Sequence, residues 1–147
     1  MVGFKDNYKK KIIPTLQKKL GVKNVLALPK IEKVVINIGL GRALKDEKFL
    51  EVAMRDLALI TGQKPKATLA RKSIANFKIR KGIIIGAVVT LRGPRMADFI
   101  SRLINIALPR TRDFRGINVK SLDKNNNLTI GVKEHIVFPE IKGEEVR

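Results

Sequence analysis

The side chains of this chain that could do chemistry are overwhelmingly cations. Thirty-one Lys and Arg stand against thirteen Asp and Glu in 147 residues, which gives a formal net charge of +18 and a pI near 10.6. An excess of this size repels itself in a compact fold and is usually offset by a polyanionic partner. Nucleic acid is the first candidate for that partner, and an anionic membrane surface is the second.

Residues suited to catalysis or metal binding are scarce. The chain has no Cys, which excludes disulfides and thiolate metal sites, and its only histidine is His135. Glu134 adjoins His135 in sequence, but neighbouring residues on a strand face opposite sides, so a catalytic pair is not expected. A structural or RNA-contacting role suits this histidine better. No nucleophile has a base placed to activate it, so we expect no enzyme, no cofactor and no metal.

One short string, GLGRAL at 39–44, is superficially similar to a dinucleotide-binding fingerprint. Leu44 stands where the third glycine of that fingerprint would be, and no acidic residue ends a following parallel strand. A simple glycine turn, or a backbone approach to an RNA phosphate, is the better interpretation. An enzyme that uses a nucleotide cofactor stays as a weak alternative, which nucleotide binding would reveal.

The basic residues concentrate in two segments without a regular pattern, 71–82 and 109–116. Arginine binds phosphate in a bidentate manner, and Asn and Ser add hydrogen bonds. A solvated basic surface is the alternative for each run. Phe77 and Phe114 either stack on RNA or anchor their loops in the core. The residues expected to contact RNA in these segments are Arg71, Lys72, Ser73, Asn76, Phe77, Lys78, Arg80, Lys81, Arg110, Arg112 and Arg115.

Polar residues also recur on two expected strands. In 31–38 the apolar residues alternate with Lys33 and Asn37, and in 83–92 Thr90 and Arg92 lie on the same side of the strand. A sheet face that offers amide, hydroxyl and cation fits the wide minor groove of A-form RNA. An ordinary hydrated sheet face is the alternative.

The elements that must position these residues follow from hydrophobic periodicity. Pro14 should kink the first helix or delay its start, and Gly62 should end the second. The pattern predicts a single α+β domain over 1–147, with a mainly antiparallel sheet, helices packed on one face and long basic loops. No stretch is long and apolar enough to span a membrane, so we expect a soluble intracellular protein. The expected helices are 6–20, 46–61 and 94–107, and the expected strands or extended pieces are 31–38, 66–70, 83–92, 117–121 and 128–133.

Three longer strings resemble the family of ribosomal protein five of the large subunit, in its bacterial or organellar form. They are GQKPKATLARKSIANFKIRKG at 62–82, VTLRGPRMADFISRLINIALPRTRDFRG at 89–116 and EHIVFPEI at 134–141. The resemblance covers about residues 5 to 145. It implies a structural constituent of the ribosome, and hence a cytoplasmic protein if bacterial or an organellar one otherwise.

The resemblance also implies particular partners. Members of this family bind 5S rRNA in the central protuberance together with ribosomal protein eighteen, and they touch the large-subunit rRNA. They also bridge to small-subunit protein thirteen and approach the P-site tRNA. The RNA-facing sheet residues of the family match Lys33, Asn37, Gln63 and Thr90, and its loop toward the tRNA and the small subunit matches 71–82.

The sequence departs from the family pattern in one respect, and one rival hypothesis for its function stays open. Bacterial members usually continue beyond the FPEI string with a further strand and a closing helix, which are missing from this sequence. We therefore expect either a naturally shortened protein or a fragment, with an edge for RNA or a neighbour to cover. The rival is a regulatory or chaperone-like nucleic-acid binder that acts off the ribosome, and absence from large subunits would favour it.

Overall fold

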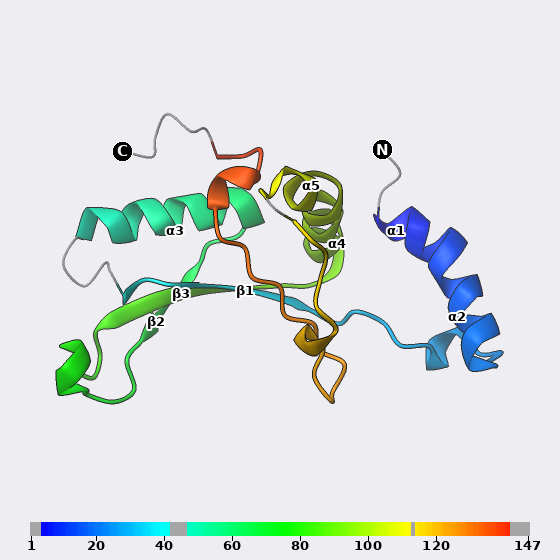
Figure 1. Ribbon diagram of the computed structural model, residues 1–147, viewed down its shortest axis with the longest axis horizontal. Coiled ribbons are helices and arrows are strands. Elements are labelled where there is room, and N and C mark those ends of the chain that lie inside the picture. Colours follow the sequence, from blue (N-terminus) through cyan, green and yellow to red (C-terminus); the bar gives the residue numbers. More distant parts are fainter. Residues whose placement is uncertain (1–3, 42–46, 113, 142–147) are drawn as a thin grey trace. The chain divides into compact units, whose positions relative to one another are not determined.

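We determined the fold from a computed structural model that describes residues 4–41, 47–112 and 114–141 (Figure 1). The chain divides into two compact units, Met1–Ile100 and Ser101–Arg147, with the boundary inside one helix. The first unit contains, in order, α1 (Phe4–Asn7), the π-helical turn η1 (Tyr8–Ile12), α2 (Ile13–Leu20), the 3-10 turn η2 (Val25–Ala27), β1 (Val34–Gly39), α3 (Glu47–Thr61), β2 (Lys66–Leu69), the 3-10 turn η4 (Ala75–Phe77), β3 (Ile84–Leu91) and most of α4 (Gly93–Arg102). The second unit continues with the π-helical turn η5 (Leu103–Ala107), α5 (Leu108–Arg110) and the 3-10 turns η6 (Val119–Ser121) and η7 (His135–Val137).

The centre of the first unit is a three-stranded sheet in the order β1-β3-β2. Both pairs are antiparallel: Ile36 lies opposite Val89, and Ala67 lies opposite Ala87. A register irregularity between Thr68 and Leu69 ends the β2 pairing. The predicted α+β class and antiparallel sheet are thus confirmed.

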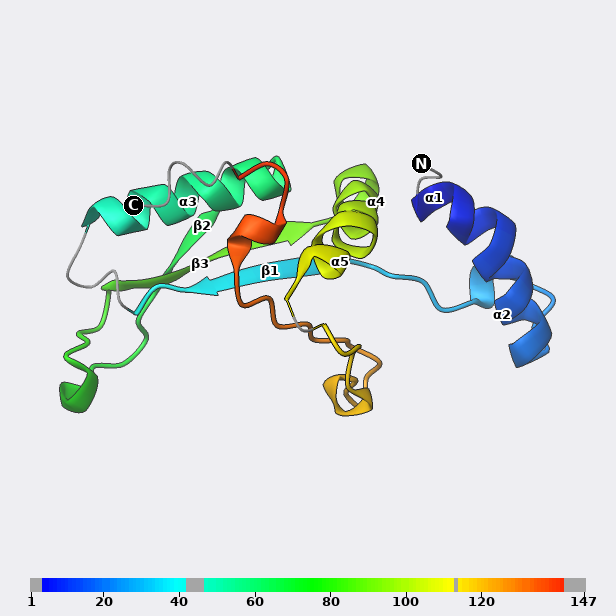
Figure 2. The same ribbon diagram turned by 45° about the horizontal axis from the view of Figure 1, so that its top comes forward.

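The core of this unit lies on one face of the sheet. The side chains of Ala87, Val89 and Leu91 alternate along β3 and are almost completely buried. The helix α3 contacts β3 and runs along this face, as Figures 1 and 2 show from two directions. Leu57 and Ile60, which are three residues apart on α3, are buried too. Alternation on the strand and helical spacing on α3 therefore create the two surfaces that pack together.

The predicted end of α3 is confirmed at Gly62. Its φ of 65° lies in the left-handed region that glycine adopts without a steric penalty, and its N–H donates to the carbonyl of Ala58 at 2.8 Å. Asp46, at the predicted start of the helix, lies outside the described residues. The helix thus stops where the chain must turn toward β2.

A close backbone approach fixes a glycine in the middle of the sheet. A Cβ added to Gly86 would lie 2.7 Å from the carbonyl oxygen of Ile38 and 2.8 Å from the hydroxyl of Thr68. Its partner across the sheet is Gly39, where an added Cβ would meet nothing within 4 Å. Only one of these two facing glycines is therefore required by packing.

We expect Gly86→Ala to lower the free energy of unfolding by about 2 kcal/mol, because the new methyl group can only be accommodated by separating β1 from β3. Gly39→Ala is the matched control and should change it far less. Chemical denaturation of both variants, followed by circular dichroism, measures the difference. Equal stability of the two variants would contradict this view of the sheet.

Two helical segments contain a proline, and a π-helical turn precedes the proline in each. Pro14 and Pro109 each occupy the beginning of a short α-helix, and each is preceded by a π-helical turn. The turns close through the N–H of Ile13, which donates to Tyr8, and that of Leu108, which donates to Leu103. Proline lacks an N–H and its ring crowds the carbonyl four residues earlier. The wider π-helical turn before each proline relieves that conflict. The first helical segment therefore begins at Phe4, before Pro14, and its start is not delayed to the proline.

Of the extended pieces expected at 117–121 and 128–133, the structure corrects the first, and neither forms a ladder with a neighbouring strand. Only an isolated bridge joins Leu122 to Leu128. Residues Val119–Ser121 form a 3-10 turn instead. The carboxylate of Asp123 accepts hydrogen bonds from the N–H groups of Asn125 and Asn127, at 2.8 and 2.7 Å, and from the Asn127 side-chain amide at 2.8 Å. Local side-chain bonds therefore close the turn 123–127 between the two pieces.

The pKa of Asp123 should lie below that of an ordinary aspartate, chiefly because the side-chain amide of Asn127 hydrogen-bonds the ionised form, with further help from backbone N–H groups. A carboxyl whose folded pKa is depressed stabilises the turn above its unfolded pKa. That contribution is lost as the pH falls through the folded pKa. Asn127→Ala should raise the pKa toward the ordinary value, which a carboxyl-detected NMR titration measures. An unchanged pKa in this variant would contradict the assignment.

The FPEI string closes the second unit. Val137, Phe138 and Ile141 are buried, and Arg102 donates a charge-assisted hydrogen bond to the Oε1 atom of Glu140. This ion pair connects the end of α4 to the last described turn. The string is therefore an internal packing element of this unit.

Candidate nucleic-acid interface

The polar residues expected on two strands do share one face of the sheet. In the antiparallel register Val35 lies opposite Thr90 and Asn37 lies opposite Val88, and residues directly opposite one another point to the same side. Asn37 is exposed and Thr90 is half-buried, while the intervening Val89 of β3 points into the core. The structure therefore brings the amide and the hydroxyl together across a single strand pair.

Two cations extend this face beyond the ladder. Lys33 directly precedes β1, Arg92 directly follows β3, and both are exposed. The last pair of the ladder is Val34 with Leu91, so one further step in the same register brings Lys33 opposite Arg92. The face therefore presents hydrogen-bonding groups at its middle and positive charge at one end.

Gln63, which the family resemblance singled out, lies beside Thr90. Its side-chain amide donates to the Thr90 carbonyl at 3.4 Å, a long hydrogen bond. The hydroxyl of Thr61 accepts from the Gln63 N–H at 3.3 Å and donates to the Leu57 carbonyl at 2.7 Å. The end of α3 thus positions the glutamine at the rim of the sheet.

Two residues of β2 belong to the same face and were missed in the sequence. Lys66 lies opposite Val88 and Thr68 lies opposite Gly86. Lys66 is exposed and Thr68 is partly so. The alternation in KATL carried this signal, but a strand of four residues is too short to show which of its faces is solvated. We define the polar sheet face as Lys33, Asn37, Lys66, Thr68, Thr90 and Arg92, with Gln63 at its rim.

The basic segment 71–82 joins β2 to β3 and has more local structure than its sequence suggested. Ile74 and Ile79 exchange backbone hydrogen bonds of 2.9 and 3.2 Å around the turn η4. The Ser73 hydroxyl accepts from the N–H of Lys81 at 3.0 Å. This bond gives Ser73 a role inside the segment. A narrow, internally bonded hairpin therefore carries the charges.

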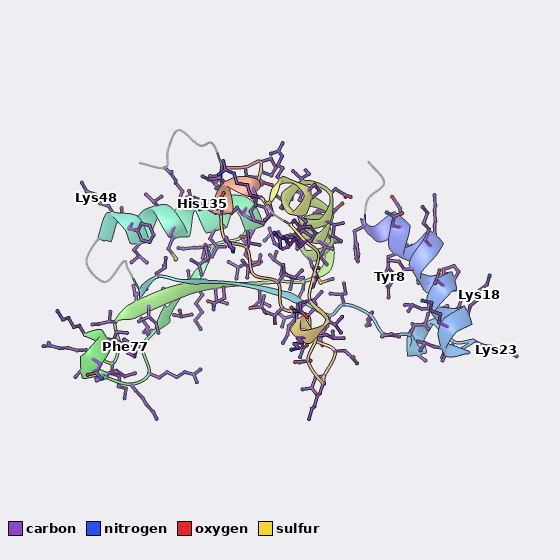
Figure 3. All side chains as sticks on the ribbon, viewed as in Figure 1. Tyr8, Lys18, Lys23, Lys48, Phe77 and His135 are labelled. Atoms are coloured by element: carbon purple, nitrogen blue, oxygen red, sulfur yellow. The ribbon has the colours of Figure 1, made fainter. Side chains whose placement is uncertain are left out.

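Phe77 lies at the tip of this hairpin, and its exposure decides whether it anchors the loop in the core. Its side chain is 67% exposed and lies in the turn η4, as Figure 3 shows. Phe77 is therefore not packed in the core. The polar and basic residues around it are all exposed. They are Arg71, Lys72, Ser73, Asn76, Lys78, Arg80 and Lys81.

The second basic run, 109–116, is partly helical, contrary to the irregular segment expected. Arg110 ends α5, Arg112 lies in a turn and Arg115 lies outside regular structure, and all three are exposed. Phe114 is 45% exposed, so it is not a core anchor either. Asp113 lies outside the described residues. The three arginines are available to solvent.

The residues considered for catalysis form no site. His135 begins the 3-10 turn η7 and is exposed. Of the glycines in the GLGR string, Gly39 is the last residue of β1 and Gly41 follows it. Among the described residues β1 pairs only in antiparallel fashion, which is not the parallel arrangement of a dinucleotide fold. Within 4–41, 47–112 and 114–141 no group of three or more metal-ligating side chains lies together. No helix in these ranges combines the length and apolar character needed to cross a bilayer.

The chain combines an antiparallel sheet, whose polar face carries cations, with a projecting basic hairpin. These features assign it to the class of basic α+β nucleic-acid-binding proteins. Comparison with known proteins narrows that class. The family model described as Ribosomal protein L5 matches residues 24–80, and the model of the C-terminus of the same ribosomal family matches residues 84–147. The chain belongs to the ribosomal protein L5 family.

Individual relatives agree with this assignment. The chain is 57% identical over 145 residues to the large ribosomal subunit protein uL5 of Dichelobacter nodosus, covering 99% of this chain and 81% of the relative. It is 50% identical over 146 residues to the protein of the same name from Alkaliphilus metalliredigens, covering 99% of this chain and 82% of the relative. It is 53% identical over 141 residues to that of Desulforapulum autotrophicum, covering 96% and 79%.

Membership of this family fixes the broad function. The chain is a structural, non-enzymatic protein of the large ribosomal subunit, and it acts in translation in association with rRNA. Because these relatives are bacterial ribosomal proteins, membership places it on the cytoplasmic ribosome. The rival interpretation of a regulator that acts off the ribosome is not needed to explain any of its features.

Proposed function

We propose that this chain binds 5S rRNA in the central protuberance of the large subunit, and that the polar sheet face is the surface that selects this RNA. The observation that carries the proposal is the register of β1 and β3, which aligns Asn37 and Thr90 on one solvated side. The family resemblance reached the same two residues independently of strand alternation. Both compact units would act together as one RNA-binding domain.

The binding mode follows from the chemistry of the face. An amide and hydroxyls on a slightly twisted sheet complement the 2′-hydroxyls and base edges displayed in the wide minor groove of an RNA helix. Lys33, Lys66 and Arg92 would neutralise phosphates along the groove. Contacts to phosphate fix the position of the protein, while the polar centre of the face discriminates between RNAs.

The remaining basic surfaces would serve other partners. The hairpin 71–82 would reach the P-site tRNA and small-subunit protein thirteen, because its charges and Phe77 are exposed around a hydrogen-bonded turn. Arg110, Arg112 and Arg115 would add contacts to the large-subunit rRNA. Ribosomal protein eighteen would share the 5S rRNA with this chain.

Selective capture from a natural mixture tests the proposal. Immobilised protein is incubated with total RNA extracted from large ribosomal subunits at physiological salt, and the retained RNA is quantified. We expect 5S rRNA to be enriched over its share of the input. Retention of 5S rRNA and fragments of large-subunit rRNA in proportion to their mass would overturn the proposal.

The hairpin has its own test. We expect Arg80→Ala combined with Lys81→Ala to weaken P-site tRNA binding to reconstituted ribosomes by roughly fivefold, because about two phosphate contacts of the hairpin are lost. The affinity for 5S rRNA should change little. The control is Lys10→Ala with Lys11→Ala, which removes the same charge from exposed positions in η1. Equal loss of tRNA binding in the control would sink the assignment of the hairpin.

A further inference from the structure

The turn η2, between α2 and β1, displays an apolar side chain among lysines. Leu26 is 91% exposed and lies in the turn η2 between α2 and β1. Isolated exposed leucines are common and need no explanation by themselves. This one differs because the chain holds it outward through a set of specific bonds.

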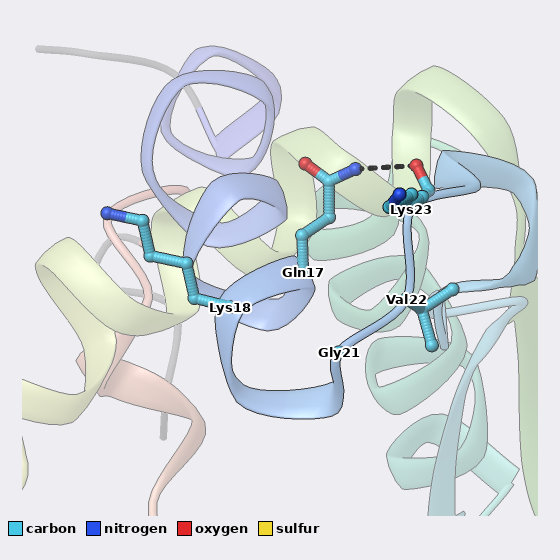
Figure 4. Close-up of a pocket in the computed structure, with 5 residues that line it drawn as sticks. All are labelled: Gln17, Lys18, Gly21, Val22 and Lys23. Carbon is cyan, nitrogen blue, oxygen red and sulfur yellow. Dashed lines mark hydrogen bonds between the residues drawn. The ribbon is translucent and has the colours of Figure 1, made fainter.

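The turn that carries Leu26 is fixed at several points. The Asn24 side chain accepts a hydrogen bond from the N–H of Leu26 at 2.9 Å. Leu28, at the end of the turn, is buried and only 6% exposed. Gln17 donates from its side-chain amide to the Lys23 carbonyl at 3.0 Å, which connects the turn to the end of α2, as Figure 4 shows. The Tyr8 hydroxyl donates to the Pro29 carbonyl at 3.2 Å. Leu26 is therefore presented on a constrained backbone.

The fold does not need a leucine at this position. Asn118 to Leu122 repeats the construction of Asn24 to Leu28: Asn118 accepts from the N–H of Lys120 at 3.0 Å, and the backbone closes the same 3-10 turn. Lys120 occupies the place that corresponds to Leu26, and it is exposed. Since the same backbone carries a lysine there, the exposed leucine is not required for the turn to form.

The surroundings identify the partner by charge. Lys18, Lys19, Lys23 and Lys30 are all exposed around the turn, and Figure 3 shows Lys18 and Lys23 at the end of α2. Among the described residues neither of these two has an ion-pair partner. Between α2 and the turn lies a shallow hollow lined by Gln17, Lys18, Gly21, Val22 and Lys23. Unpaired lysines are point charges suited to phosphate.

We propose that the turn at 24–28 and this hollow form a second rRNA-binding site, which takes an unpaired or bulged RNA segment. The phosphates would lie against Lys18 and Lys23, and a base or ribose would pack on Leu26. Proteins use apolar side chains in this way against unstacked nucleotides. The site adds an apolar contact that no basic patch alone would supply.

The test separates apolar from ionic contact by salt dependence. The affinities of the full chain for 5S rRNA and for large-subunit rRNA are measured separately over a series of KCl concentrations. We expect Leu26→Gln to weaken binding to one of these RNAs by about tenfold with the salt slope unchanged, because the lost contact releases no counterions. Leu26→Met should bind within about twofold of the natural chain, since methionine keeps the apolar contact. Lys23→Ala should reduce the slope by about one.

Two results on RNA contact would overturn the proposal, and a third concerns stability. One is unchanged affinity of Leu26→Gln for both RNAs. The other appears when a photoreactive benzophenone replaces Leu26 in assembled large subunits: crosslinks to a ribosomal protein alone would show that a protein covers the leucine. The melting temperature of Leu26→Gln should equal that of the natural chain, and a large drop would show that the leucine serves the fold instead.

Discussion

The affinity of this chain for 5S rRNA should fall by about three orders of magnitude when the salt concentration rises from about 50 to about 200 mM. Each phosphate that a lysine or arginine neutralises releases condensed counterions, and added salt opposes that release. With a net charge of +18 and exposed cations on the polar sheet face, a contact to six or more phosphates is expected.

Fluorescence anisotropy of labelled 5S rRNA over a range of KCl concentrations measures this slope. A plot of log affinity against log salt should be linear and steep. The control is the same titration with Lys33→Ala combined with Arg92→Ala, which should flatten the slope by about two. A slope close to zero in the natural chain would show that charge does not supply the affinity.

The second large effect concerns two uncharged residues. We expect Asn37→Ala and Thr90→Ala each to weaken 5S rRNA binding by about tenfold, and the double variant by about a hundredfold if the two contacts are independent. Each substitution removes a hydrogen-bonding group that faces the RNA without changing the net charge. The salt slope should therefore stay as it is, whereas the whole binding curve shifts.

Lys11→Ala provides the matched comparison for this prediction. Lys11 is exposed in η1 and far from the strands in sequence, so its loss removes a charge but no contact of the sheet face. We expect about a twofold effect. If Lys11→Ala weakened binding as much as Asn37→Ala, the polar sheet face would not be the selective surface.

Much of the scaffold could be predicted because its signals are local. Alternation placed Thr90 and Arg92 on one side of their strand, and the structure buries Ala87, Val89 and Leu91 on the other side. Hydrophobic periodicity likewise predicted the helix α3, whose Leu57 and Ile60 are buried. Segments that satisfy their backbone through side chains were not predictable in this way. Asn118 holds a 3-10 turn where the extended piece 117–121 was expected.

The candidate site was predicted in part for the same reason. Alternation assigned Asn37 and Thr90 to solvated sides of their own strands. It could not show that these sides coincide, because a shift of one residue in register turns every side chain of a strand to the opposite face. The pairing of Val35 with Thr90 supplies that information. The register of β2 with β3 likewise brings Lys66 and Thr68 onto this face, and the sequence alone did not show it.

The most direct test of the central claim is the ratio of affinities for 5S rRNA and for an unrelated structured RNA of equal length, measured at one salt concentration. The Asn37→Ala/Thr90→Ala double variant should lower this ratio by at least about tenfold. The Arg80→Ala/Lys81→Ala hairpin variant should leave it unchanged. A ratio that the sheet variant preserves, or that the hairpin variant abolishes, would contradict the claim that the polar sheet face selects 5S rRNA.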